Sequence, residues 1–367
     1  MVLSIASRGG NRYIVCRIIP SERGSILKRV VITGPSKCGL EDVAEPTVAA
    51  NYAKVKIFAA PLCTEYHSFV KGDPHPMGGH EAAGEVVEVG PGATTVKVGD
   101  RVVVMPQNSC GVCELCTSGE HIYCQNGKDW KAICGCDTGR QTYAEYCIQQ
   151  DWLLLPIPDG ISYDHGSMAC CGLGPAFNAM QAMNVTATDT VLVSGLGPVG
   201  LGACVIACYR GARVIGLDMS PYRAELAKRI GVETVVDPTD EEAALKEILD
   251  LTEGKGVDKA VGCSGVKSAP AFLVKATRRR GQLASPGWGG DMSSRELTAK
   301  GLTFHGCWHW NHLRDGEVMM RTIRGAADLI DIAITHTFPL SKVQEAFEVR
   351  ATNECGKIIL NPWGDQT

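Results

Sequence analysis

Four closely spaced cysteines mark one segment of the chain, NSCGVCELCTSGEHIYC at 108–124. Cys110, Cys113, Cys116 and Cys124 follow a C-x2-C-x2-C-x7-C spacing. Four thiolates fill the tetrahedral shell of zinc and leave no position for a substrate or a water molecule. The spacing therefore predicts a structural zinc that stabilises a loop, and we expect the reactive chemistry elsewhere.

A second metal site is suggested by less conspicuous residues. The stretch APLCTEYHSF at 59–68 contains Cys63, and MGGHEAAGEVVEVGPGA at 77–93 contains His80 followed by Glu81 in a glycine-rich turn. A catalytic zinc needs three protein ligands and one open position, and it prefers thiolate and imidazole donors. Each of these residues alone would be typical of a buried thiol or a core histidine, so the prediction depends on their coming together in the fold.

A glycine-rich loop predicts a nucleotide site. In VLVSGLGPVGLG, an apolar strand leads directly into a G-x-G-x-x-G pattern and then into a helix. The three glycines allow a tight turn, a close approach of the backbone to a pyrophosphate, and close packing of helix against strand. The N-terminus of the helix supplies N–H groups to the anion. The residues predicted to bind the cofactor here are Gly195, Leu196, Gly197, Pro198, Val199 and Gly200.

The choice between NAD and NADP depends on Asp218, at the end of the next strand-like run, RVIGLD. A carboxylate at this place accepts both ribose hydroxyls of NAD and repels a 2'-phosphate, so NAD is the predicted cofactor. Capping of the following helix is the alternative role for Asp218. Arg223 lies five residues further on, and we expect it to contact the ribose from one side.

Two segments with different sequence patterns must position these residues. From about 28 to 157, short strand-like runs are broken by Gly, Pro and Asp, which predicts a β-rich, barrel-like domain. From about 180, strands alternate with helices, which predicts a parallel sheet covered on both faces. The C-terminal segment returns to the pattern of the first domain, with a helix around 316–330 and a strand at 356–360. The predicted divisions are an N-terminal extension at 1–27, a catalytic domain at 28–175, a nucleotide domain at 176–310 and a return segment at 311–367.

Composition excludes several classes of protein. The 367 residues are 45% hydrophobic and 21% charged with a net charge of -4, so a polyanion partner such as nucleic acid is not expected. The one dense basic run, TRRRG at 277–281, is predicted to be a solvated helix end. No apolar run approaches the ~18 residues of a membrane span. The first residues lack the pattern of a secretory signal.

The cysteine content indicates a reducing compartment. Seventeen cysteines are spread along the chain instead of framing a small disulfide-rich domain, and we expect a cytoplasmic protein that uses several thiolates for metal. Cys134 and Cys136 form a lone C-x-C in a glycine-rich turn, for which a structural role is the simpler interpretation.

Taken together, these motifs resemble the zinc-dependent alcohol dehydrogenases of the medium-chain dehydrogenase/reductase family, from about Lys28 to the C-terminus. The family signature around the histidine is met by Gly79, His80, Glu81, Gly84, Gly90 and Ala93. The resemblance implies an α/β fold in which a Rossmann doubly wound parallel sheet is inserted into a GroES-like β-barrel catalytic domain. It also implies an active site in the cleft between the two.

The same resemblance implies the ligands of the catalytic zinc. Cys63 and His80 are two of them, and Glu81 lies beside the metal. The third family ligand stands just before the nucleotide domain, where MACCGLG offers Cys170 and Cys171. We choose Cys171, because a Cys-Gly pair stands there in many relatives.

The proton relay departs from the family pattern. Relatives have Ser or Thr two residues after the first cysteine, whereas this chain has Glu65, with Thr64 one place early and His67 four places on. If Glu65 points inward, it could take the proton, approach the zinc or bind a substrate hydroxyl. Alternatively Thr64 or His67 serves the relay, or Glu65 faces a neighbouring helix or solvent.

The expected function is reversible hydride transfer between an alcohol or polyol and NAD, with two zinc ions per chain and an aldehyde or ketone as the product. One alternative is a specialised biosynthetic dehydrogenase or reductase for a larger hydroxylated substrate. The other is a nucleotide-binding relative that has lost turnover. The expected partners are a small-molecule alcohol or carbonyl substrate and further copies of the chain, as a homodimer or homotetramer, with no nucleic acid and no membrane.

Overall fold

The computed structural model describes residues 2–8, 11–17, 26–73, 78–129, 132–133, 139–286 and 289–366, the first two segments as backbone only. Those two form an antiparallel pair, β1 (Val2–Arg8) and β2 (Asn11–Arg17). Within this described part, no helix has the length and apolar character needed to cross a bilayer.

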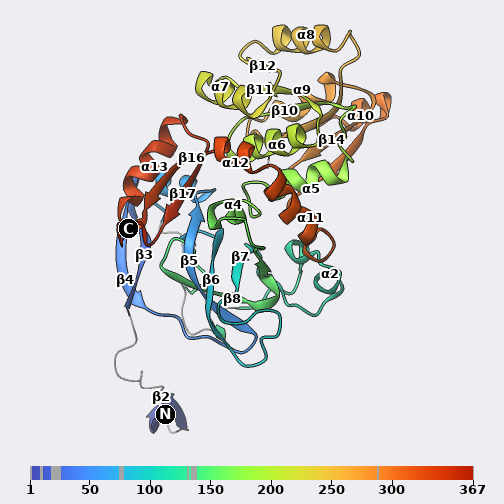
Figure 1. Ribbon diagram of the computed structural model, residues 1–367. Coiled ribbons are helices and arrows are strands. Elements are labelled where there is room, and N and C mark those ends of the chain that lie inside the picture. Colours follow the sequence, from blue (N-terminus) through green and yellow to red (C-terminus); the bar gives the residue numbers. More distant parts are fainter. Residues whose placement is uncertain are drawn as a thin grey trace.

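One sheet joins strands from distant parts of the sequence. Its order is β16-β17-β5-β6-β7-β9, and β8 also pairs with β5. The C-terminal β17 runs antiparallel to β5, so the end of the chain completes the sheet that the first half began (Figure 1). The seven strands are β5 (Tyr52–Pro61), β6 (Ala82–Val89), β7 (Arg101–Val104), β8 (Tyr146–Gln150), β9 (Leu154–Pro156), β16 (Ile334–Pro339) and β17 (Lys357–Asn361).

Shorter elements surround this sheet. A separate antiparallel hairpin precedes it, and the return helix α13 packs on β16, β17 and the hairpin strand β4. The elements are β3 (Ile26–Gly34), β4 (Lys37–Ala44), α1 (Glu65–Lys71), α2 (Glu114–Thr117), η1 (His121–Tyr123), η2 (Asp151–Leu153), α4 (Tyr163–Ser167), α5 (Gly174–Ala182), η3 (Leu340–Lys342), α13 (Val343–Thr352) and η4 (Gly364–Gln366).

The second sheet is parallel throughout and has the order β12-β11-β10-β13-β14-β15. Along β10, Val191 and Val193 belong to one apolar core while Leu192 belongs to another. Both faces are therefore buried under helices, as the apolar strand sequences predict. The strands are β10 (Thr190–Ser194), β11 (Arg213–Leu217), β12 (Thr234–Val236), β13 (Val257–Gly262), β14 (Thr277–Ser285) and β15 (Thr303–Gly306).

Helices connect these strands and continue into the return segment (Figure 1). Several begin at the cap residues that their sequences offer; Asp240, for example, accepts N–H bonds from Glu242 and Ala243 at the start of α8. The fold class predicted from the sequence is confirmed. The helices are α6 (Pro198–Tyr209), α7 (Pro221–Ile230), α8 (Glu241–Leu251), α9 (Ala269–Ala276), α10 (Ser294–Lys300), α11 (His312–Gly325) and α12 (Ala327–Ala333).

The basic run at 277–281 is not a helix end, and this prediction was wrong. Helix α9 stops at Ala276, and the run forms the beginning of β14. There the pairing with β13 is irregular, and Arg280 has a φ of 61°. Arg278 donates to Asp258 at 2.6 Å, so part of the positive charge is neutralised within the sheet.

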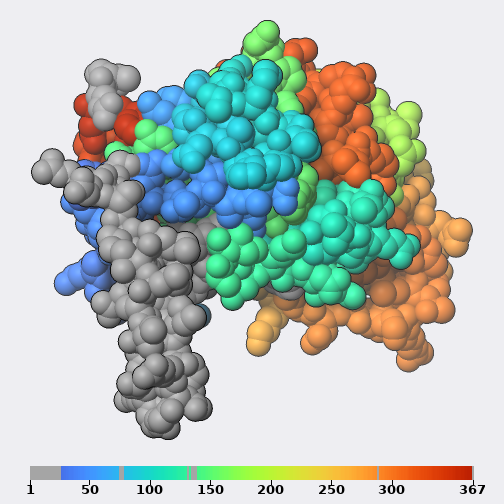
Figure 2. Space-filling view, turned by 90° about the horizontal axis from the view of Figure 1, so that it is seen from below, coloured from blue at the N-terminus to red at the C-terminus, as the bar shows by residue number. Residues whose placement is uncertain are grey.

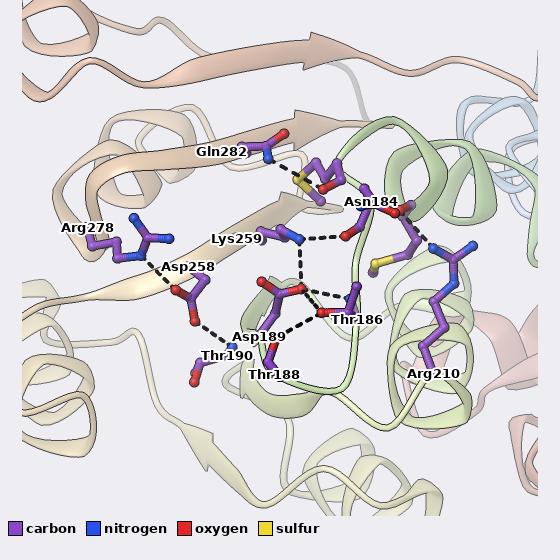
Figure 3. Close-up of polar contacts among 12 residues, drawn as sticks. Asn184, Thr186, Thr188, Asp189, Thr190, Arg210, Asp258, Lys259, Arg278 and Gln282 are labelled. Atoms are coloured by element: carbon purple, nitrogen blue, oxygen red, sulfur yellow. Dashed lines mark hydrogen bonds and ion pairs between the residues drawn. The ribbon is translucent and has the colours of Figure 1, made fainter.

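A polar cluster fixes the connection between α5 and the parallel sheet (Figure 3). The ammonium group of Lys259, on β13, donates to the Asn184 carbonyl and to Asp189 Oδ2, both at 2.7 Å. Asp189 Oδ2 also accepts the N–H of Thr186 at 2.7 Å. Because Lys259 is only 8% exposed, loss of its partner would leave a buried charge unpaired.

Candidate metal centres and nucleotide site

The four-cysteine lobe brings its sulfur atoms together. Cys113 and Cys116 Sγ are 3.4 Å apart, Cys110 and Cys116 Sγ 3.8 Å, and Cys113 and Cys124 Sγ 3.9 Å. Figure 2 shows the lobe in teal against the orange surface of the segment that includes α11, where Asn311 donates to the Ser118 carbonyl at 2.7 Å. The lobe is thus fixed to the rest of the molecule.

The chemistry of this donor set fits a divalent cation. The N–H groups of Val112 and Cys113 help to lower the pKa of Cys110 to about 6. Burial, and then the thiol of Cys113, raise the pKa of Cys116 to about 12. Thiolates this close repel one another, and a bound zinc removes that repulsion for all four. Cys134 and Cys136 lie outside the described residues.

The other predicted ligands also converge. Cys63 follows β5, His80 and Glu81 precede the neighbouring β6, and Cys171 lies in the turn between α4 and α5. One ligand atom from each of these four residues lies within 4.8 Å of the others. His80 Nε2 is 3.3 Å from Cys171 Sγ. Hydrogen bonding from Cys171 lowers the pKa of Cys63 despite its burial, and Lys357 and His80 lower it further.

The neighbouring Cys170 points elsewhere. Its thiol is buried and donates to the Val104 carbonyl at 3.3 Å, and burial raises its pKa well above the usual value. Of the two cysteines that the sequence offered, only Cys171 is therefore part of the ligand group.

Glu65 lies at the first position of α1 and is directed at this group. One carboxylate oxygen contacts His80 Nδ1, and the other accepts the hydroxyl of Tyr143 at 3.0 Å. Tyr143 in turn accepts the N–H of Cys63 at 3.2 Å. Glu65 is thus placed to orient the His80 ring so that Nε2 faces the sulfur atoms.

The alternative relay residues lie outside the ligand group. Thr64 occupies the N-cap position of α1 without a side-chain capping bond, and it is exposed. His67 is also exposed, beside the ring of Tyr66 at a centroid distance of 5.9 Å. The parts that Glu65, Thr64 and His67 play in proton transfer stay predictions.

Glu81 makes a buried ion pair that the sequence analysis missed. Lys357, on β17, donates to Glu81 Oε1 at 2.9 Å, and the two side chains are 2% and 0% exposed. Glu81 Oε2 accepts the N–H of Cys171 at 2.9 Å. Burial raises the pKa of Glu81 to about 8, although Lys357 opposes this shift. The signal in the sequence was a lysine within the otherwise apolar strand GKIIL.

The glycine loop lies between β10 and α6 and satisfies the predicted requirements. Gly195 has a φ of 85°, a conformation that other residues rarely adopt. A Cβ on Gly200 would lie 1.8 Å from the Gly195 carbonyl oxygen, whereas one on Gly197 would meet nothing within 4 Å. Gly197 therefore leaves open space at the start of the helix, where a pyrophosphate would approach.

The two residues predicted to contact the ribose follow β11. Asp218 Oδ2 accepts the N–H of Leu196 at 2.6 Å, and Oδ1 accepts that of Ser220 at 2.8 Å, so the carboxylate is held against the glycine loop. Arg223 donates to Asn353 Oδ1 at 3.0 Å, which ties α7 to the end of α13. Its Nε is buried without a partner among the described residues.

A close contact joins the nucleotide helix to the metal group. A Cβ on Gly202, in α6, would lie 2.0 Å from the carbonyl oxygen of Gly172, the residue after Cys171. Only glycine permits this approach between the helix and the turn. The nucleotide loop and the candidate ligands are consequently positioned by one packed contact.

Comparisons with known proteins agree with this arrangement. Residues 49–159 match the alcohol dehydrogenase GroES-like domain family, and residues 198–324 match the zinc-binding dehydrogenase family. The chain is 32% identical to the uncharacterized zinc-type alcohol dehydrogenase-like protein YphC of Escherichia coli strain K12, over 90% of this chain and 97% of that protein.

Two further proteins are similar to this chain over nearly as much of its length. The L-threonine 3-dehydrogenase of Pyrococcus abyssi is 31% identical over 87% of this chain and 94% of its own length. A solved NAD-dependent alcohol dehydrogenase superposes with a TM-score of 0.75 at 27% identity, over 91% of this chain and 99% of that one. The chain therefore belongs to the zinc-dependent alcohol dehydrogenases of the medium-chain dehydrogenase/reductase family, which are oxidoreductases.

Proposed function

We propose that the protein transfers hydride reversibly between an alcohol or polyol and NAD, with the aldehyde or ketone as the oxidised product. The observation that carries the proposal is the grouping of Cys63, His80, Glu81 and Cys171 beside the turn that packs on α6. A silent relative would have no need of this complete set of ligand atoms. The set therefore favours an enzyme over a nucleotide-binding protein without turnover.

In this proposal Cys63, His80 and Cys171 hold a catalytic zinc, and the four-cysteine lobe holds a structural one, which makes two per chain. These three residues would hold a zinc ion that supplies Lewis acidity to a bound alcohol. Glu65 orients His80. Lys357 pairs with Glu81 and opposes the rise of its pKa, so that the carboxyl group stays beside the ligands in the buried site.

The proposed cofactor is NAD, which accepts or supplies the hydride. The helix start at Gly197 would receive the pyrophosphate, and the held carboxylate of Asp218 would accept the ribose hydroxyls. A 2'-phosphate at the same place would be repelled by that carboxylate. Arg223 donates a hydrogen bond to Asn353, and in this proposal it also contacts the ribose from one side.

The substrate is a small molecule. The proposed location of the protein is the cytoplasm, and its proposed assembly is a homo-oligomer. Among the described strands, β15 lies at one edge of the parallel sheet, and the side chain of its Phe304 is 42% exposed. An open edge with an exposed aromatic side chain can pair with the same strand of a second copy. This edge supports a dimer as the smallest assembly.

The function can be tested by metal analysis together with a substrate screen. Purified protein is expected to hold about two zinc ions per chain. It should reduce NAD, and NADP much more slowly, with at least one member of a panel of primary alcohols, secondary alcohols, polyols and sugars. Removal of both zinc ions by a chelator should abolish turnover. Intact zinc with no NAD reduction across the panel would contradict the proposal.

A further inference from the structure

Tyr143 contacts both segments that carry the candidate ligands Cys63 and His80. It lies in the loop before β8 and is 1% exposed. Its N–H donates to the carbonyl of Gly78, two residues before His80, at 2.8 Å. A Cβ on Gly79 would lie 2.4 Å from the Tyr143 ring, so the ring packs directly on the turn that leads to His80. Tyr143 is therefore fixed to this turn through its backbone and its side chain.

The hydroxyl of Tyr143 has three polar neighbours. It accepts the N–H of Cys63 at 3.2 Å, and it lies 3.0 Å from Glu65 Oε2 and 3.2 Å from the carbonyl oxygen of Pro61. A hydroxyl has one proton to donate, and the carboxylate is both the nearer and the charged acceptor. The proton therefore points to Glu65, while the N–H of Cys63 orients the hydroxyl from the other side.

These contacts form one continuous chain of hydrogen bonds. The N–H of Cys63 donates to Tyr143, Tyr143 donates to Glu65, and Glu65 contacts His80 Nδ1. Glu65 is only 7% exposed, so water is a poor substitute for the phenol as a donor to its carboxylate. The orientation of the His80 ring thus depends on Tyr143 as well as on Glu65.

Packing alone does not account for the hydroxyl. The Tyr143 ring meets Phe347, on α13, edge-on at 6.3 Å, and Phe347 is stacked on Phe69 at 4.7 Å. A phenylalanine ring at position 143 would make the same apolar contacts. What tyrosine adds is a hydroxyl group directed at Glu65.

We propose that Tyr143 is a positioning residue for the candidate metal centre, because its hydroxyl holds the Glu65 carboxylate against His80. This inference rests on the proposed function, in which His80 is a ligand of zinc, and deepens it by naming a residue that acts through Glu65. A ligand held in its binding orientation has less freedom to lose when the ion binds, so Tyr143 raises the affinity for zinc.

The test measures the zinc affinity of Tyr143→Phe by competition with a chelator. The ion that Cys171→Ser loses identifies the signal of the ligand group and separates it from that of the lobe. Tyr143→Phe should bind that ion about tenfold more weakly, with the dissociation constant of NADH changed by less than about twofold. Cobalt bound in place of zinc should show shifted absorption bands at this site, which a purely structural role for Tyr143 would leave unchanged.

A double variant tests whether the effect passes through Glu65. Glu65→Ala/Tyr143→Phe should bind zinc no more weakly than Glu65→Ala alone, because residues that act in series do not add. If Tyr143→Phe folds poorly, 4-aminophenylalanine at position 143 keeps the ring and a donor. It should bind zinc within about threefold of the wild-type affinity, and failure to do so would overturn the inference.

The control is Tyr146→Phe, the same substitution three residues further on, where the ring meets Trp363 edge-on at 5.6 Å. It should leave the zinc affinity and the cobalt bands unchanged. Wild-type zinc affinity in Tyr143→Phe, or a loss that adds in full to that of Glu65→Ala, would overturn the inference and leave the proposed function in place. If Cys171→Ser lost no zinc, the proposed function would fail and the inference with it.

Discussion

At the scale of single residues, the least expected finding is the position of Glu65. A carboxylate two residues after the first ligand could have been a proton acceptor, but both of its oxygens already have partners, in His80 and Tyr143. A carboxylate that holds the second nitrogen of a ligating histidine fixes the ring and strengthens it as a donor. We propose that Glu65 is a positioning residue for the candidate metal centre.

Replacement of Glu65 should therefore weaken metal binding before it changes chemistry. We expect Glu65→Ala to lower zinc affinity at this site by about 10–100-fold, measured by competition with a chelator. The matched control is Glu88→Ala, since Glu88 is half exposed and pairs with Lys54 away from the ligands. If Glu65→Ala kept the wild-type zinc affinity and an unchanged turnover at every pH, Glu65 would be neither a positioning residue nor a proton acceptor.

At the scale of elements, the contact between α6 and the turn after Cys171 connects the two halves of the site. Gly202→Ala would bring a methyl group to 2.0 Å from the Gly172 carbonyl oxygen. Overpacking of this kind costs about 1–3 kcal/mol, more than the gain in helix propensity. The variant should show a lower free energy of unfolding in denaturant and a raised KM for NAD.

The control for this change is another glycine within a helix. Gly316, in α11, has only a Leu155 methyl group at 3.2 Å from its Cβ position, and that side chain can move. Gly316→Ala should therefore be close to neutral. Equal stability of the Gly202→Ala and Gly316→Ala variants would show that the contact is looser than described.

The polar cluster around Lys259 predicts a pH dependence of stability. Burial opposes ionisation of Asp189, but hydrogen bonds from Lys259 and Thr186 outweigh it and lower its pKa below the ordinary value of 3.8. A carboxyl group with a depressed pKa in the folded state stabilises the protein above its unfolded pKa, and this contribution is lost as the pH falls through the folded pKa. The stability of wild type minus that of Asp189→Asn should thus be largest above pH ~5 and shrink toward pH ~3.

Denaturant unfolding at several pH values checks this expectation. The double variant Asp189→Asn/Lys259→Met should recover part of the lost stability, because the buried ammonium is removed with its partner. A difference that stays constant from pH ~5 to pH ~3 would contradict the assignment to Asp189.

Sequence patterns predicted some levels of this structure better than others. The strand–loop–helix unit with Gly195, Gly197 and Gly200 is a local signal, because turn, glycine and helix start are adjacent in the chain. Lys357 and Tyr143 could not be found in this way. Their partners Glu81 and Glu65 are 276 and 78 residues away, and only the closed sheet brings them together.

At the scale of the whole molecule, the described edge strand β15 predicts association. The chain has a mass of 39.2 kDa, and light scattering should give about twice that value or a higher even multiple. Phe304→Lys adds a charge to the exposed edge and should shift the protein toward the monomer. An assembly that this substitution leaves unchanged would show that the copies meet at another surface.

In the proposed function, Cys63, His80 and Cys171 hold a catalytic zinc while the lobe holds another. Cys170→Ser and Cys171→Ser test it most directly, with zinc content and NAD reduction measured on each. Cys171→Ser should lose turnover and about one zinc per chain. Cys170→Ser, whose thiol donates to the Val104 carbonyl outside the ligand group, should retain both. A fully active Cys171→Ser enzyme with two zinc ions would show that Cys171 is not a ligand of a catalytic zinc.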